Sequence, residues 1–207
     1  QWSGPNGFTS NQQNPTITNS GSTNAGTYTV TVTDGNNCTA TATVDVTINA
    51  LPTATANANP NPICEGQTLN LTSSGGTSYS WTGPGGFTSS DQNPVINNIS
   101  TTQAGTYSVI VTSNAGCNAT TSISVTVNTN PTVSINPIPD LCASDPIYTP
   151  AGNPTGGTWT FNGIPISDID PSAYTPGSYI LVYNYTDGNG CSNSASITVN
   201  IVDCGCI

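Results

Sequence analysis

The chain has 207 residues, which is room for one or two ordinary domains, and it contains ten acidic residues but no Lys, Arg or His, so its net charge is −10. Without a cation it has no side chain to neutralise phosphates, which excludes nucleic-acid binding. It has neither a basic patch for anionic lipids nor an apolar run of about 18 residues, so we expect no direct membrane insertion.

The composition indicates an all-β protein. Hydrophobic residues make up only 34% of the chain. They are mainly Val, Ile, Ala, Tyr and Trp, set among Thr, Ser, Asn and Gly, which is the chemistry of strands and turns. Pro or Gly interrupts nearly every stretch, so we expect no helix of substantial length.

An internal repeat is the strongest pattern in the sequence. Residues 2–10 recur as residues 81–89, and the later motifs of the two copies keep the same offset of 79 with no gap. A third, more divergent copy keeps Trp159 and ends near Cys191. A period of this length suits a small sandwich domain better than one turn of a solenoid.

Apolar and polar residues alternate at the end of each repeat. In the first copy the pattern points Tyr28, Val30 and Val32 to one face and the intervening threonines to the other. After a turn at residues 34–37, residues 39–48 alternate in the same way. Similar turns occur at residues 113–116 and 187–190. Each repeat is therefore predicted to end in a β-hairpin.

Stretches rich in Pro, Asn and Thr separate the repeats and favour extended, semi-rigid connections. They predict domains at residues 1–50, 51–129 and 130–203, with 204–207 as a tail or the start of another linker. By the offset of 79, the counterpart of Cys64 in the first domain falls before Gln1. We therefore expect the first domain to be incomplete, and to be completed either by an upstream part of a longer chain or by a neighbouring subunit.

Several motifs resemble immunoglobulin-like or PKD-like repeats of large secreted surface proteins of Bacteroidetes. The motifs are Ile63-Cys64-Glu65-Gly66, Tyr79-Ser80-Trp81, Ala104-Gly105-Thr106-Tyr107 and Gly116-Cys117. The resemblance covers essentially the whole chain, and it is strong in the third copy, from Gly156 to Cys191. It implies tandem immunoglobulin-like β-sandwiches, export by the type IX route, and a place in adhesins, surface filaments or the stalks of secreted enzymes.

Seven cysteines in a chain without His favour disulfides in an oxidising compartment over zinc. In antibody domains the second Cys lies two residues after a conserved Tyr; here it follows the corresponding Tyr by ten or twelve residues. The resemblance then implies the bridges Cys64–Cys117 and Cys142–Cys191, each stabilising its domain by roughly 4 kcal/mol. The cysteines left unpaired within the chain are Cys38, Cys204 and Cys206.

The hairpin turns also offer oxygen ligands. Asp34, Asn36, Asp187 and Asn189 are ordinary turn residues, but hard oxygens on an acidic chain also suit Ca²⁺. We expect these residues to form turns, with calcium as the alternative, and we expect no other cofactor.

Catalysis is not expected. Without His or Lys, the chain has no Ser-His-Asp or Cys-His arrangement and no Schiff-base amine. The close carboxylate pair Asp168 and Asp170 lies in a Pro-rich loop, where we expect a turn.

The sequence thus predicts a structural and adhesive segment of an extracellular fibre or giant adhesin. Its expected partners are further repeats or other copies of the same surface protein, together with surface glycans. One alternative is a filament subunit completed by strand exchange with its neighbour. Another is a carbohydrate-binding accessory module that uses the loop residues Phe8 and Phe87, although packing is the first expectation for both rings.

Overall fold

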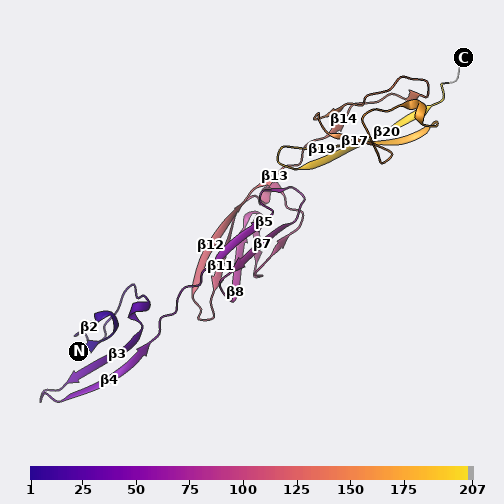
Figure 1. The fold of residues 1–207 in the computed structure, drawn as a ribbon. Helices are drawn as coiled ribbons and strands as arrows, with labels where there is room; N and C mark the ends of the chain where they lie inside the picture. Colours follow the sequence, from indigo (N-terminus) through magenta and orange to yellow (C-terminus); the bar gives the residue numbers. More distant parts are fainter. Residues whose placement is uncertain (205–207) are drawn as a thin grey trace.

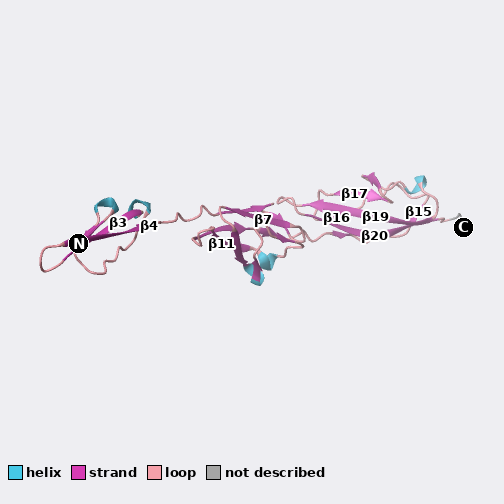
Figure 2. Ribbon diagram, turned by 90° about the horizontal axis from the view of Figure 1, so that it is seen from below, coloured by secondary structure: helices cyan, strands magenta, loops and turns pink. Residues whose placement is uncertain are grey.

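The computed structural model describes residues 1–204, which form β-strands, short 3₁₀ turns and loops, with no α-helix among them. The strands fall into three groups, and each sheet draws its strands from a single group. We call these groups the N-terminal module (β1–β4), the middle module (β5–β13) and the C-terminal module (β14–β20). Both views show them strung end to end in one elongated row (Figures 1 and 2).

The middle module is a two-layer sandwich. One sheet has the order β12-β11-β8-β9 and the other β10-β7-β5, while β13 and β6 pair in parallel. Its strands are β5 (Thr55–Asn59), β6 (Ile63–Cys64), β7 (Leu69–Ser74), β8 (Ser78–Gly83), β9 (Phe87–Ser89), β10 (Val95–Ile96), β11 (Gly105–Thr112), β12 (Asn118–Val125) and β13 (Val127–Asn128).

The core of the middle module lies between these two sheets. Trp81 of β8 and Tyr107 and Val109 of β11 are fully buried on one side, and Leu69 and Leu71 of β7 on the other. Alternate residues of β11 point outward, so the alternation of apolar and polar residues in the sequence gives the strand one buried face and one solvent-exposed face.

The C-terminal module is a second sandwich with a larger main sheet, in the order β15-β20-β19-β17-β18, beside the small pair β14-β16. Its strands are β14 (Ser134–Ile135), β15 (Leu141–Cys142), β16 (Gly152–Asn153), β17 (Thr158–Phe161), β18 (Ile164–Ile166), β19 (Gly177–Thr186) and β20 (Ser192–Val202). Phe161, Leu181 and Val199 are buried at its centre.

The N-terminal module has one sheet, in the order β2-β1-β3-β4. Its strands are β1 (Trp2–Ser3), β2 (Thr9–Ser10), β3 (Gly26–Thr33) and β4 (Thr39–Val46). They reproduce β8, β9, β11 and β12 of the middle module in order and pairing. Among residues 1–204, no second sheet covers this one.

The all-β class predicted from the sequence is confirmed, and the middle and C-terminal modules are β-sandwiches as expected. The three predicted hairpins also form, as β3–β4, β11–β12 and β19–β20. No helix in the described part of the chain has the length and apolarity needed to cross a bilayer.

The structure corrects both predicted disulfides. Cys64 is bonded to Cys191, and Cys142 is bonded to Cys204. The pairings Cys64–Cys117 and Cys142–Cys191 are wrong, and so is the expectation that Cys204 is unpaired. Cys38 and Cys117 are free thiols, the first exposed and the second half-buried. The prediction for Cys206 lies outside the described residues.

The physical reason is that the predicted partners lie at opposite ends of a module. Cys64 pairs in register with Asn128, just beyond β12, whereas Cys117 precedes the first residue of β12. Ten residues of extended strand separate two such positions by about 30 Å, and a disulfide needs Cα atoms within about 7 Å. Cys142 likewise pairs with Val202, at the end of β20 opposite to Cys191.

Candidate functional site

The uncovered face of the N-terminal sheet is the most unusual surface of the molecule. Val32 is 61% exposed, Val44 50% and Val46 37%. The residues 79 positions later are covered: Val111 is 0% exposed and Val125 2%, and Ile123 is half-buried. The same alternation therefore exists in both modules, but only the middle module supplies the sheet that makes it a core. We call the exposed surface the open face.

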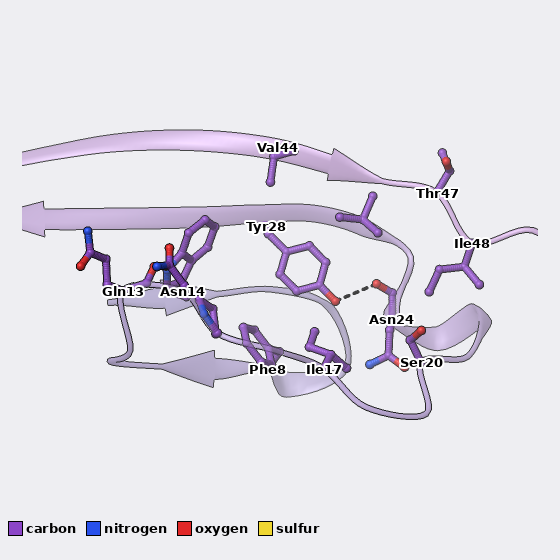
Figure 3. Close-up of a pocket in the computed structure, with 13 residues that line it drawn as sticks. Phe8, Gln13, Asn14, Ile17, Ser20, Asn24, Tyr28, Val44, Thr47 and Ile48 are labelled. Atoms are coloured by element: carbon purple, nitrogen blue, oxygen red, sulfur yellow. Dashed lines mark hydrogen bonds between the residues drawn. The ribbon is translucent and has the colours of Figure 1, made fainter.

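A cavity of about 590 Å³ lies beside the open face. Figure 3 shows Phe8, Tyr28, Val44 and Ile48 around it, contributed by the loop after β1, by β3, by β4 and by the segment after β4. The Tyr28 hydroxyl donates a 2.8 Å hydrogen bond to the Asn24 carbonyl, which ties the ring to the turn that precedes β3. The cavity is thus preformed by the half-module itself.

Polar groups at the rim of this cavity match groups that hold a strand in the middle module. The Gln92 side-chain amide donates to the Ser73 carbonyl of β7 at 2.8 Å, and the side-chain Oδ1 of Asn93 accepts from the Ser73 N–H at 3.3 Å. The Leu71 N–H of the same strand donates to the Pro94 carbonyl at 3.0 Å. The residues 79 positions earlier, which line the cavity, are Gln13, Asn14 and Pro15.

The junction between the middle and C-terminal modules is covalent. The disulfide joins Cys64, on β6, to Cys191, which follows the β19–β20 turn. Both residues are buried. Two side-chain hydrogen bonds of 3.0 Å flank the bond, from Asn130 to the Glu65 carbonyl and from Asn193 to the Pro131 carbonyl. The disulfide and these hydrogen bonds together hold the two modules at the linker.

At the junction between the N-terminal and middle modules, the cysteine equivalent to Cys191 is present, but among residues 1–204 the N-terminal module has no cysteine equivalent to Cys64. Cys117 follows the β11–β12 turn, as Cys191 follows the β19–β20 turn, and its sulfur lies 3.9 Å from the Asn49 carbonyl oxygen. Asn49 is the counterpart, 79 residues earlier, of Asn128, which pairs with Cys64. Cys117 therefore faces the place where a partner equivalent to Cys64 would lie.

The four residues considered as calcium ligands form turns. The Asp187 carboxylate accepts from the backbone N–H groups of Asn189 and Cys191, both at 2.9 Å. Asp34 does the same with Asn36 and Cys38, at 2.9 and 2.8 Å. Within residues 1–204, no group of three or more His, Cys, Asp or Glu side chains could hold a metal ion. Calcium binding at these turns stays a prediction.

The loop aromatics pack against the core tyrosines. Phe8 meets Tyr28 edge-on with ring centroids 5.5 Å apart, and Phe87 meets Tyr107 at 5.4 Å. Both Phe rings are half-buried. Packing accounts for their positions, and glycan contact remains a prediction.

The two neighbouring carboxylates of the C-terminal module, Asp168 and Asp170, accept hydrogen bonds that hold the loops around them. Asp168 accepts hydrogen bonds from Thr149 at 2.6 Å and Ser167 at 2.9 Å, and these bonds hold the pKa of its carboxyl below the ordinary value. Asp170 accepts from the Ser172 N–H at 3.1 Å at the start of a 3₁₀ turn.

Sequence reasoning missed the inter-module disulfide and the rim residues Gln13 and Asn14. The repeat contains a signal for the rim, because Gln-Asn-Pro recurs as residues 13–15 and 92–94. The disulfide has no local signal, since it depends on which ends of two modules meet in space.

No model of a known protein family matches the sequence, and no curated protein matches it. Similar solved structures include the N-terminal eight Ig domains of Down Syndrome Cell Adhesion Molecule, at 16% identity and a TM-score of 0.46, covering 86% of this chain and 28% of that one. A Ca²⁺-stabilized adhesin of an Antarctic bacterium that binds ice is 19% identical, with a TM-score of 0.45, and 86% of this chain matches 56% of it. A 1.5-MDa bacterial ice-binding adhesin is 20% identical, with a TM-score of 0.38, over 86% of this chain and 74% of the other.

Proposed function

We propose that the chain is a structural and adhesive segment of an extracellular bacterial surface fibre or giant adhesin. Its tandem modules act as a spacer that holds an attached group at a set distance and direction. The resemblance noted in the sequence extends this proposal to export by the type IX route of Bacteroidetes. Its partners are then further repeats or copies of the same surface protein, and surface glycans.

The observation that carries the proposal is the Cys64–Cys191 disulfide, because it joins the end of one module to the facing end of the next. A short linker alone leaves two domains free to reorient. A buried disulfide beside that linker removes most of this freedom, as a spacer requires. Disulfides also persist in oxidising, extracellular environments.

Small-angle X-ray scattering of the oxidised chain tests the proposal. The long strands have 8 to 11 residues, which is about 27–37 Å at about 3.4 Å per residue. Three modules in a row, with their turns and linkers, therefore span on the order of 100 Å. We expect this maximum dimension for the native chain, and a broader distance distribution when Cys64→Ser and Cys191→Ser are combined. The matched control is Cys38→Ser with Cys117→Ser, which leaves both disulfides in place.

All variants carry Cys206→Ser, which removes a cysteine outside the described residues as a source of cross-links between chains. A compact, folded-back particle in the native protein would contradict a spacer. So would identical scattering with and without the junction disulfide.

A further inference from the structure

We propose that the open face of the N-terminal module receives a segment of the repeat's own kind, equivalent to residues 51–79 and joined ahead of Gln1, and that the cysteine of this segment forms a disulfide with Cys117. The proposal rests on the proposed function in treating the chain as linked modules. It extends the covalent junction between the middle and C-terminal modules to the junction before it.

The first argument is the shape and apolarity of the open face. In the middle module, residues 55–74 supply β5, β6 and β7, and Leu69 and Leu71 of β7 are fully buried against the opposite sheet. The N-terminal module presents the same sheet, with Val32, Val44 and Val46 exposed. A strand with leucines at alternate positions would convert these valines into a core.

The second argument is the set of unused polar groups at the rim. Gln92, Asn93 and Pro94 hold the backbone of β7 through three hydrogen bonds, to Ser73 and Leu71. Gln13, Asn14 and Pro15 repeat these residues and line the cavity, and Figure 3 shows Gln13 and Asn14 among the lining side chains. The rim therefore matches a strand of the β7 type in hydrogen bonding as well as in shape.

The third argument is the position of Cys117. In the middle module, β6 lies parallel to β13, with the Ile63 N–H donating to the Thr126 carbonyl at 3.0 Å and the Glu65 N–H to the Asn128 carbonyl at 2.8 Å. The corresponding carbonyls in the N-terminal module belong to Thr47 and Asn49. A strand of the β6 type on those carbonyls places its cysteine beside Asn49, and the Cys117 sulfur lies 3.9 Å from the Asn49 oxygen.

A second copy of this chain is a poor donor of the missing segment. In each copy, β7 is already paired with β5 and β10, and Cys64 is already bonded to Cys191. In the middle module, β7 leads directly into β8, the strand that carries Trp81. The segment for the N-terminal module therefore belongs immediately ahead of β1, which carries Trp2.

The proposed bond is an ordinary oxidation of two thiols. The two Cys S–H groups lose two protons and two electrons as the S–S bond forms. A small-molecule disulfide accepts them and is reduced to two thiols.

The test is a graft of residues 51–79 ahead of Gln1 in the full chain, so that Gln1 takes the place that Ser80 has after Tyr79. The graft carries Asn57→Gln as a mass mark at an exposed position. Cys206→Ser removes the cysteine that lies outside the described residues. The protein is refolded in a glutathione redox buffer, alkylated and mapped by mass spectrometry after non-reducing chymotryptic digestion. We expect the marked cysteine to be linked to Cys117, with Cys38 alkylated and Cys64–Cys191 intact.

Two variants of the graft serve as controls. Changing its cysteine to serine should leave Cys117 alkylated while β3 and β4 still gain protection from hydrogen exchange. Changing the leucines equivalent to Leu69 and Leu71 to aspartate should abolish that protection. The native Cys64–Cys191 bond in the same digest reports that the rest of the protein has folded.

Linkage of the marked cysteine to Cys38, or a reduced marked cysteine in a protein with intact Cys64–Cys191, would overturn the proposal. Protection of Cys117 in a dimer of the ungrafted chain would also overturn it and identify a second copy as the occupant. The scattering experiment tests the junction between the middle and C-terminal modules, whereas the graft tests the junction at Cys117. The spacer proposal and the open-face proposal can therefore fail independently.

Discussion

Tyrosine hydroxyls tie loops to the core in all three modules. The Tyr28 and Tyr107 hydroxyls donate to the carbonyls of Asn24 and Gln103, at 2.8 and 2.9 Å. The Tyr183 hydroxyl donates to the Pro154 carbonyl at 2.6 Å and accepts from the Gly157 N–H at 2.7 Å. Burial raises the pKa of the Tyr107 hydroxyl, so it remains a donor throughout the neutral range.

Replacing these tyrosines by phenylalanine gives a graded prediction. Tyr107→Phe loses one hydrogen bond and should lower the free energy of unfolding of its module by about 1 kcal/mol. Tyr183→Phe also leaves the Gly157 N–H without its partner and should cost about 2–3 kcal/mol. Each module contains one tryptophan, so urea unfolding followed by fluorescence of single-tryptophan variants measures each effect separately. Equal losses at the two sites would contradict this assignment.

Asp168 gives a prediction for pH dependence. The Thr149 hydroxyl, followed by the Ser167 hydroxyl, holds the pKa of this carboxyl below its ordinary value of 3.8. A lowered folded-state pKa stabilises the protein above the unfolded-state value, and the stabilisation is lost as pH falls through the folded-state value. Thr149→Val should therefore raise the Asp168 pKa in a carbon-detected NMR titration. Ser167→Ala should raise it less, and the reverse order would refute the assignment.

At the scale of elements, the hairpins were predictable because their alternation and turn residues are local. Asp34 and Asp187 each cap a turn that the sequence already marks. The burial of the strands was not predictable in the same way. Val32 and Val111 occupy equivalent positions, yet one is 61% exposed and the other 0%, because a separate sheet decides the difference.

The disulfides failed as predictions for a related reason. The repeat assigns Cys117 and Cys191 to one position and Cys64 and Cys142 to another, but spacing alone does not say that β6 and β15 pair in parallel with the far end of the last strand. That pairing is a non-local property of the fold, and it separates the predicted partners by the length of a strand.

The two disulfides should differ in what they stabilise. Cys142–Cys204 closes a separation of 62 residues within one module, so in the chain-entropy model its loss should cost that module about 4 kcal/mol. Denaturation followed at Trp159 in a Cys142→Ser, Cys204→Ser variant measures this cost. Removing Cys64–Cys191 should change the unfolding of the C-terminal module less, because that bond closes its loop across two modules.

At the scale of the whole molecule, composition leads to a further prediction. The chain contains no Lys or Arg, so trypsin should leave it uncut even after reduction and denaturation. Chymotrypsin should cut the native protein first in the N-terminal module, because among residues 1–204 no second sheet covers the sheet that contains Trp2. Gel analysis of timed digests distinguishes the two enzymes. Equal survival of the denatured chain in both would show that composition is not the source of resistance.

The domain limits predicted at residues 50/51 and 129/130 stay a prediction. They are compatible with the gaps between β4 and β5 and between β13 and β14. The repeat is the basis of these limits, whereas the linkage between modules depends on contacts that no single repeat contains.

The junction disulfide also determines how the molecule responds to tension. A pull applied beyond residues 51 and 204 follows the covalent chain from residue 51 to Cys64, crosses the sulfur–sulfur bond to Cys191, and continues along β20 to Cys204. Residues 65–190 lie outside this shortest covalent path, in loops closed by Cys64–Cys191 and Cys142–Cys204, so the path bypasses most of both modules. The two stretches on the path span at most about 3.3–3.6 Å per residue. The folded parts of both modules would then come apart without letting the tether between the two ends grow beyond that length.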